Sequence, residues 1–167
     1  MEEVVKSSIL MNQEGEKSEM MQLVTFLLAG EIFGIDILKV QEISPMTKIT
    51  RVPNAPNFVE GVINLRGKVI PVVDLRKILN LELKNYDMDS RIIVLHLENK
   101  IIGVLVDRMS EVLWVNKNMI ETNPTQADSK VSDNYIIGVV NLEDRLIILL
   151  DLYKVFNIQT EQKKLMF

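Results

Sequence analysis

The sequence predicts a mainly β protein built of two small modules of one topology that share a hydrophobic core. Short apolar, β-branched runs alternate with tight turn residues, a pattern typical of small barrels or a sandwich. A long segment occurs twice in the same order, which indicates two equivalent modules. Because a module of this size buries only roughly 60% of its unfolded surface, the two are expected to pack together as one unit.

Turn residues and polar stretches divide the chain. Two hairpins are predicted where apolar runs flank short turns, at residues 23–35 and 91–106. The polar residues 84–90 separate the two modules, and the polar, aperiodic start of the chain is interpreted as a flexible leader. The predicted units are a leader, two modules and a tail, at residues 1–19, about 20–83, about 90–157 and 161–167.

The internal repeat is the most informative feature of the sequence. Residues 61–79 return 77 positions later as residues 138–156, with eight of the 19 positions identical and most others exchanged between apolar residues. Upstream, Glu42 follows Gly34 by eight positions, as Glu111 follows Gly103. The repeated Gly61 and Gly138 precede strands at points that favour positive φ or close backbone approach. Asp74 and Asp151 are predicted to cap helices of one or two turns.

The two copies differ at their predicted turn tips, Arg66-Gly67-Lys68 and Glu143-Asp144-Arg145. Exposed turn charges contribute little to stability, so this difference predicts different surroundings for the two tips. We hypothesise that Arg66 lies at a contact surface, with Glu42 within reach either of Arg66 or of the partner that binds there. Pro71 cannot donate a ladder hydrogen bond, which predicts an edge strand or a bulge at that point.

Composition restricts the function. The 167 residues carry 19 basic and 23 acidic side chains, a net charge of −4, which argues against nucleic-acid binding because phosphates need a concentrated positive surface. No cysteine and one histidine leave little for metal or nucleophilic chemistry. The longest apolar runs are of strand length and the start is acidic, so a cytoplasmic protein without membrane insertion is expected. These features favour a protein that is not an enzyme.

Candidate chemical sites are few. The segment 61–68 lacks the spacing and the Ser or Thr of a phosphate-binding loop, and His96 has no visible partner for catalysis or metal binding. Trp114 is either a core residue or an interface anchor, and Met109 either faces a partner or fills the core. The residues alone therefore indicate an adaptor that works through surfaces.

The segments 34–43, 52–56 and 58–76, with support from 103–107 and 138–142, resemble the CheW family of bacterial chemotaxis coupling proteins. The resemblance covers residues 20–160. It implies two five-stranded SH3-like β-barrels that share a core and hold no cofactor or metal. It also implies an adaptor, monomeric when free, that links the cytoplasmic tip of chemoreceptors to the regulatory domain of the histidine kinase CheA. Such a protein is cytoplasmic and is recruited to membrane-associated receptor arrays.

The resemblance also implies site residues. Receptor or kinase contacts are expected at Val40, Glu42, Gly61, Arg66, Met109 and Val112, and kinase contacts with weaker support at Val24 and Ile37. For the apolar positions and Gly61 the alternative is a core or backbone role, and for Glu42 and Arg66 it is an exposed ion pair. Alternative functions are a CheW-like regulatory module of another sensory kinase pathway and, disfavoured by charge, a nucleic-acid-binding barrel.

Overall fold

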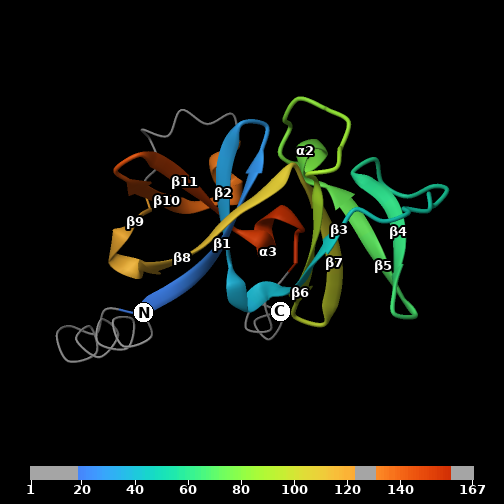
Figure 1. The fold of residues 1–167 in the computed structure, drawn as a ribbon, viewed down its shortest axis with the longest axis horizontal. Coiled ribbons are helices and arrows are strands. Elements are labelled where there is room, and N and C mark those ends of the chain that lie inside the picture. The colour runs from blue at the N-terminus through green and yellow to red at the C-terminus, as the bar shows by residue number, and fades with distance from the viewer. Residues whose placement is uncertain (1–18, 123–130, 159–167) are drawn as a thin grey trace.

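The structure, a computed structural model, describes residues 19–122 and 131–158 as two packed β-sheets (Figure 1). The leader, apart from Glu19, and the tail at 161–167 lie outside the described residues. The strands are β1 (Met20–Leu28), β2 (Glu31–Asp36), β3 (Val40–Pro45), β4 (Val59–Leu65), β5 (Lys68–Asp74), β6 (Arg91–Leu97), β7 (Lys100–Val106), β8 (Arg108–Asn116), β9 (Ile120–Glu121), β10 (Ile136–Leu142) and β11 (Arg145–Leu150). The helices are α2 (Leu75–Ile78) and α3 (Leu152–Val155), with the 3-10 turns η1 (Ile37–Lys39), η2 (Lys117–Met119) and η3 (Asp133–Tyr135).

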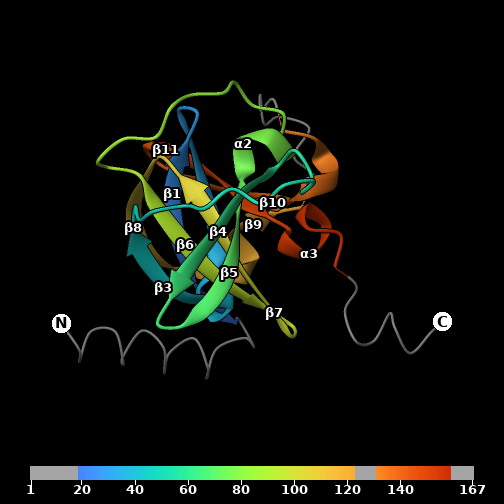
Figure 2. The same ribbon diagram turned by 90° about the vertical axis from the view of Figure 1, so that its right-hand side faces the viewer.

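Two sheets account for these strands. Sheet I has the order β8-β1-β2-β11-β10-β9, and sheet II has the order β3-β6-β7-β5-β4. Turned by 90°, sheet II faces the viewer in front of sheet I (Figure 2). Neighbours pair antiparallel except β2 with β11 and β5 with β7, which pair parallel. The mainly β fold with short helices is thus confirmed, although within the described residues the sheets are open and sheet I gains the two-residue strand β9.

The sheets do not follow the two predicted modules. Each sheet combines the first hairpin of one sequence copy with the later strands of the other copy, so β1 and β2 lie beside β10 and β11 (Figure 1). In sheet I, Gly34 of β2 lies opposite Leu149, and in sheet II, Gly103 of β7 lies opposite Val72. The division into modules at about 20–83 and 90–157 is therefore wrong at the level of strand pairing. A repeat identifies equivalent strands, but its apolar pattern fits a partner from either copy.

A single hydrophobic cluster lies between the sheets. Phe26 and Phe33 of sheet I stack with ring centroids 5.9 Å apart, and the same cluster holds Val73, Ile93 and Val104 of sheet II. Each sheet also wraps a smaller cluster of its own. Burial of this shared apolar surface is the main term that holds the sheets together, which agrees with the predicted common core.

The local predictions for the repeat hold except at Pro71. A Cβ on Gly61, at φ +154°, would overlap the carbonyl oxygen of Thr50, which explains the glycine. The side chain of Asp74 accepts from the Arg76 N–H at 2.9 Å and caps α2. The strand β5 is an inner strand, so the edge position predicted for Pro71 is wrong, and the register shift in its pairing with β4 lies between Val59 and Gly61, opposite Val73 and Val72. The ladder to β7 begins one residue later, at Val72, and leaves room for the proline.

Asp151 repeats this cap in the second copy, where its side chain accepts from the Lys154 N–H at 3.2 Å at the start of α3. Both helices are a single turn long. In the part of the chain that the structure describes, none of the helices has the length and apolar character needed to cross a membrane.

Candidate functional site

An ion pair connects the edge strand β3 of sheet II to the turn that follows the other edge strand, β4. Arg66, in the turn between β4 and β5, donates from both terminal nitrogens to Glu42 of β3, at 2.9 and 2.8 Å. The Arg66 side chain is 76% exposed and that of Glu42 is 22% exposed. The hydrogen bonds from Arg66 lower the pKa of Glu42, and those same bonds raise the pKa of Arg66. Both groups are therefore charged at neutral pH, and they lie at the surface beside the open edges of sheet II.

The equivalent pair occurs in sheet I. Glu111 of the edge strand β8 forms an ion pair with Arg145, the first residue of β11. By the repeat, Arg145 stands at the position of Lys68, yet it contacts the glutamate that corresponds to Glu42. The difference in tip charge was expected to reflect different surroundings of the two tips. The structure shows the same contact at both, because each tip places an arginine on an edge-strand glutamate. Different partners for the two tips remain a prediction.

An exposed aliphatic side chain follows each of these glutamates. Ile43 of β3 is 41% exposed and Val112 of β8 is 50% exposed. Ile43 was not among the predicted site residues, although its position in the repeat, equivalent to Val112, would have indicated it. Each sheet thus presents a glutamate, an arginine and an aliphatic side chain at its open edge. This combination offers both charge recognition and apolar burial to a partner.

The remaining predicted site residues fall into two groups. Ile37, Val40 and Met109 are partly buried and pack against the cluster between the sheets. The assignment of Val24 to a kinase-facing surface is wrong, because this side chain is 2% exposed and lies inside the same cluster. Gly61 is buried beside Thr50, and the structure gives it a backbone-packing role.

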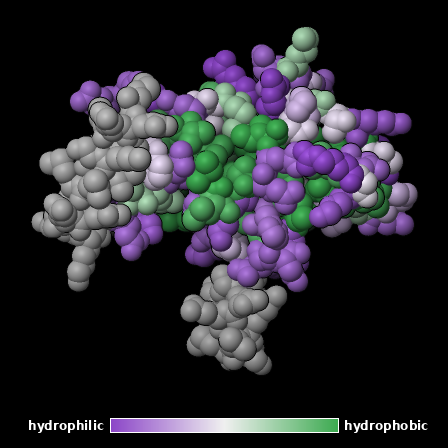
Figure 3. Space-filling view, turned by 60° about the horizontal axis from the view of Figure 1, so that its bottom comes forward, coloured by the Kyte–Doolittle hydropathy of each residue, from purple (hydrophilic) through white to green (hydrophobic). Residues whose placement is uncertain are grey.

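The tryptophan on β8 belongs to the surface. Trp114 is 49% exposed, so its assignment to a barrel core is wrong and the alternative of an interface anchor remains. It lies two residues after Val112 on the same strand, and the two side chains point to the same side. Hydrophobic side chains also gather at the centre of one face of the molecule, surrounded by hydrophilic ones (Figure 3). His96 is exposed.

A groove of about 690 Å³ lies between sheet II and the segment around α3. Its lining comes from β4, β5, β7 and α2 on one side and from η3 and the segment around α3 on the other. It is mainly apolar, with Phe58, Ile78, Ile102, Tyr135, Val155 and Phe156. The resemblance to the CheW family implies a groove between the two barrels that receives the receptor tip, and this role stays a prediction for the groove described here.

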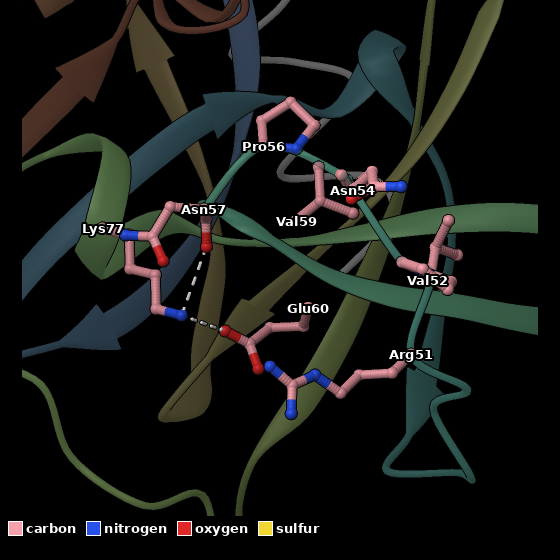
Figure 4. Close-up of a pocket in the computed structure, with 10 residues that line it drawn as sticks. Arg51, Val52, Asn54, Pro56, Asn57, Val59, Glu60 and Lys77 are labelled. Atoms are coloured by element: carbon pink, nitrogen blue, oxygen red, sulfur yellow. Dashed lines mark hydrogen bonds and ion pairs between the residues drawn. The ribbon is translucent and has the colours of Figure 1, made fainter.

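A second hollow, of about 590 Å³, lies under the loop 51–57 (Figure 4). Lys77 of α2 forms an ion pair with Glu60 at 2.8 Å and donates to the carbonyl oxygen of Asn57 at 3.2 Å. Arg51 points toward Glu60 from the other side (Figure 4). These contacts connect the loop to α2 and β4, so the polar groups of this hollow already serve the fold.

Two open β-sheets around one core, with matching polar and apolar side chains at their edges, define a β-rich module suited to binding other proteins. The chain belongs to the CheW-like domain family, whose model matches residues 22–161. It is 37% identical to the chemotaxis protein CheW of Klebsiella aerogenes, over 81% of each chain, and 34% identical to that of Treponema pallidum, over 87% of each. The crystal structure of the scaffolding protein TtCheW from Thermoanaerobacter tengcongensis has a TM-score of 0.76 at 35% identity and covers 84% of this chain and 97% of that one.

Proposed function

We propose that this chain is a chemotaxis adaptor that couples chemoreceptors to the histidine kinase CheA. The observation that carries the proposal is the match to the CheW-like family over residues 22–161, supported by relatives of 32–37% identity that are chemotaxis proteins CheW. The protein then works by binding and holds no cofactor. Its site of action is the cytoplasmic side of receptor arrays, and the free protein is a monomer.

The open edge of sheet II is the proposed contact surface for the kinase or the receptor. Arg66 and Glu42 are charged and accessible, and Ile43 beside them offers apolar area. A partner that covers this edge would exclude water from the pair, which makes each charge more important than it is at a free surface. Val40 and Ile37 pack beneath this region, and their contribution is to hold β3 in place.

The matching edge of sheet I is the second proposed contact surface. Glu111 and Arg145 supply the charges, and Val112 and Trp114 supply exposed apolar area. Met109 packs beneath this edge as Val40 does in sheet II. Two equivalent edges on opposite sheets would let one chain bridge two partners, which is what coupling requires.

The alternative of a regulatory module in another sensory kinase pathway is not favoured. The relatives that this chain matches over most of their length are chemotaxis proteins CheW, whereas it covers only 41% of the chemotaxis protein CheV3 of Helicobacter pylori. Binding assays with a CheA regulatory domain and a receptor cytoplasmic fragment distinguish the two. Failure to bind either at micromolar concentration would contradict the proposal.

The contact surface is tested with Arg66→Glu. We expect this variant to bind CheA or the receptor fragment at least tenfold more weakly, because the covered charge is reversed, with an unchanged unfolding midpoint. Lys48→Glu, which reverses another exposed cation outside the ion pair, serves as the control and should bind as the unchanged chain does. Equal binding of the two variants would remove Arg66 from the contact surface.

A further inference from the structure

A cavity of about 220 Å³ opens beside α3, where the apolar cluster wrapped by sheet I ends. This is several times the roughly 30 Å³ that one water molecule occupies in the liquid. Most of its lining is apolar, and its polar groups come from side chains at the helix and from η1. The lining includes Leu23, Gly34, Ile35, Lys39, Ile137, Leu149, Asp151 and Tyr153.

The repeat shows which part of sheet II corresponds to this cavity. Leu23 pairs with Asp36 across β1 and β2, as Ile92 pairs with Leu105 across β6 and β7. Gly34 lies opposite Leu149, as Gly103 lies opposite Val72. Asp151 and Tyr153 stand where Asp74 and Arg76 stand in the first copy. The walls of the cavity therefore have a counterpart, residue by residue, in sheet II.

In sheet II a tyrosine lies at the corresponding place. The Tyr86 hydroxyl donates to Oδ1 of Asp74 at 2.5 Å, and the Arg76 guanidinium lies 5.1 Å from the centre of the Tyr86 ring. The ring also packs against the cluster that contains Val72 and Ile92. By the repeat, one aromatic side chain in sheet II thus contacts residues that correspond to the cavity walls of sheet I.

The chain leaves both helices in the same way. The Leu81 N–H donates to the Arg76 carbonyl oxygen at 2.8 Å, and the Ile158 N–H donates to the Tyr153 carbonyl oxygen at 2.7 Å. The preceding asparagines, Asn80 and Asn157, have φ values of 59° and 53°. Five residues after Leu81 the chain delivers Tyr86 to the cluster of sheet II. The segment that leaves α3 at the equivalent place is residues 159–167.

We propose that the cavity beside α3 is a docking site for the segment 159–167 of this chain, with the ring of Phe167 in the place that Tyr86 takes in sheet II. Phe167 is the one aromatic residue in this segment, and Leu165 and Met166 precede it. By the repeat, Lys163 corresponds to Tyr86, and an ammonium group is not suited to an apolar cavity. Nine residues span up to about 30 Å when extended, so length does not prevent Phe167 from reaching a cavity beside Tyr153.

The chemistry of the lining supports an aromatic ring without a hydroxyl group. Leu23, Ile35 and Leu149 provide apolar walls, against which a ring loses its contact with water. The Asp151 carboxylate accepts from the Lys154 N–H and is only partly buried, so it does not require a second donor as the buried Asp74 does.

A disulfide-trapping experiment tests the docking, because the chain has no cysteine of its own. Met166→Cys is combined with Ile137→Cys, whose position lines the cavity and is 48% exposed, and mild oxidation with copper phenanthroline is followed by mass spectrometry. We expect an intrachain disulfide to form at least fivefold faster than in the control that combines Met166→Cys with Val69→Cys, at an exposed position of sheet II. Adding Phe167→Ser to the first pair should slow its formation to the rate of the control.

Two results would overturn the proposal. One is equal trapping in the Met166→Cys, Ile137→Cys variants that retain or lack Phe167, since the ring would then play no part. The other is a disulfide-linked dimer in place of the intrachain bond, since the cavity would then receive a second copy. Circular dichroism of each variant before oxidation verifies that the sheets are intact.

Discussion

Arg76 and Asp107 form an ion pair that joins the two sheets. The Arg76 side chain, on α2 after sheet II, is 1% exposed, and Asp107 lies between β7 of sheet II and β8 of sheet I. The other oxygen of Asp107 accepts from the Ala29 N–H at 3.0 Å, in the turn between β1 and β2. The guanidinium therefore holds the crossover between the sheets and, through Asp107, the first hairpin of the chain.

Replacing this arginine should be costly. We expect Arg76→Met to lower the free energy of unfolding by about 3 kcal/mol, because it leaves a largely buried carboxylate without its cation. Urea unfolding at unchanged slope measures the loss.

The counterpart at the other crossover provides the control. Lys39 in η1 donates to the Tyr153 hydroxyl at 2.7 Å, and Tyr153 occupies the repeat position of Arg76. The Tyr153 hydroxyl carries no charge, and this contact is more exposed than the ion pair of Arg76 with Asp107. Lys39→Met should therefore lower the free energy of unfolding by less than about 1 kcal/mol. Equal losses for the two variants would show that burial of Arg76 does not set its importance.

The exchange of hairpins between the sheets predicts cooperative unfolding. Neither sequence copy forms a sheet by itself, and the cluster around Phe26 and Ile93 belongs to both sheets. We therefore expect one calorimetric transition whose van't Hoff and calorimetric enthalpies agree. Two resolved transitions would indicate that the sheets unfold independently.

The structural features that could be predicted from the sequence are those that depend on residues close together in the chain. The turns and the caps at Asp74 and Asp151 depend on neighbours in the chain, and the structure has them as expected. The pairing of β2 with β11 depends on which of two similar strands arrives, and the repeat cannot decide this. The burial of a single side chain likewise depends on which distant strands pack against it.

The candidate site shows this limit at three residues. Val24 and Val112 are paired on adjacent strands, yet one is 2% and the other 50% exposed, because β8 is an edge strand. Trp114 is exposed for that same reason. By contrast, Glu42 was hypothesised to lie within reach of Arg66 or of a partner, and the structure shows the first of these.

Two glycines in the repeat offer a matched comparison of backbone effects. Gly61 and Gly67 both have positive φ, but a Cβ would overlap the Thr50 carbonyl only at Gly61, whereas Gly67 faces open space. Gly67→Ala should cost about 1 kcal/mol from the backbone conformation alone. Gly61→Ala should cost more, about 2–4 kcal/mol, because backbone must move as well. Denaturant midpoints of the two variants compare the costs, and equal values would contradict the steric explanation.

The partly buried Tyr86 predicts a loss of stability at alkaline pH. Burial and the hydrogen bond to Asp74 raise the pKa of Tyr86 far above its ordinary value near 10. A raised pKa in the folded state means that the contribution is complete below about pH 10 and falls as pH rises further, since only the unfolded chain then ionises this group. Unfolding measured from pH 8 to 11.5 should show this decline, and Tyr86→Phe should show a shallower one. The same slope in both proteins would refute the assignment.

A charge swap separates the two roles that the pair of Arg66 and Glu42 can have. Glu42→Arg combined with Arg66→Glu keeps an ion pair across the edges of sheet II but exchanges the positions of its charges. If the side chains meet a partner directly, as proposed, the double variant should fold with an unchanged midpoint and still bind CheA or the receptor fragment at least tenfold more weakly. If the pair serves only to hold β3 against the turn after β4, the double variant should recover binding that the single variants lose. Titration calorimetry on all three variants gives the comparison, and recovery of binding would move the contact surface away from this edge.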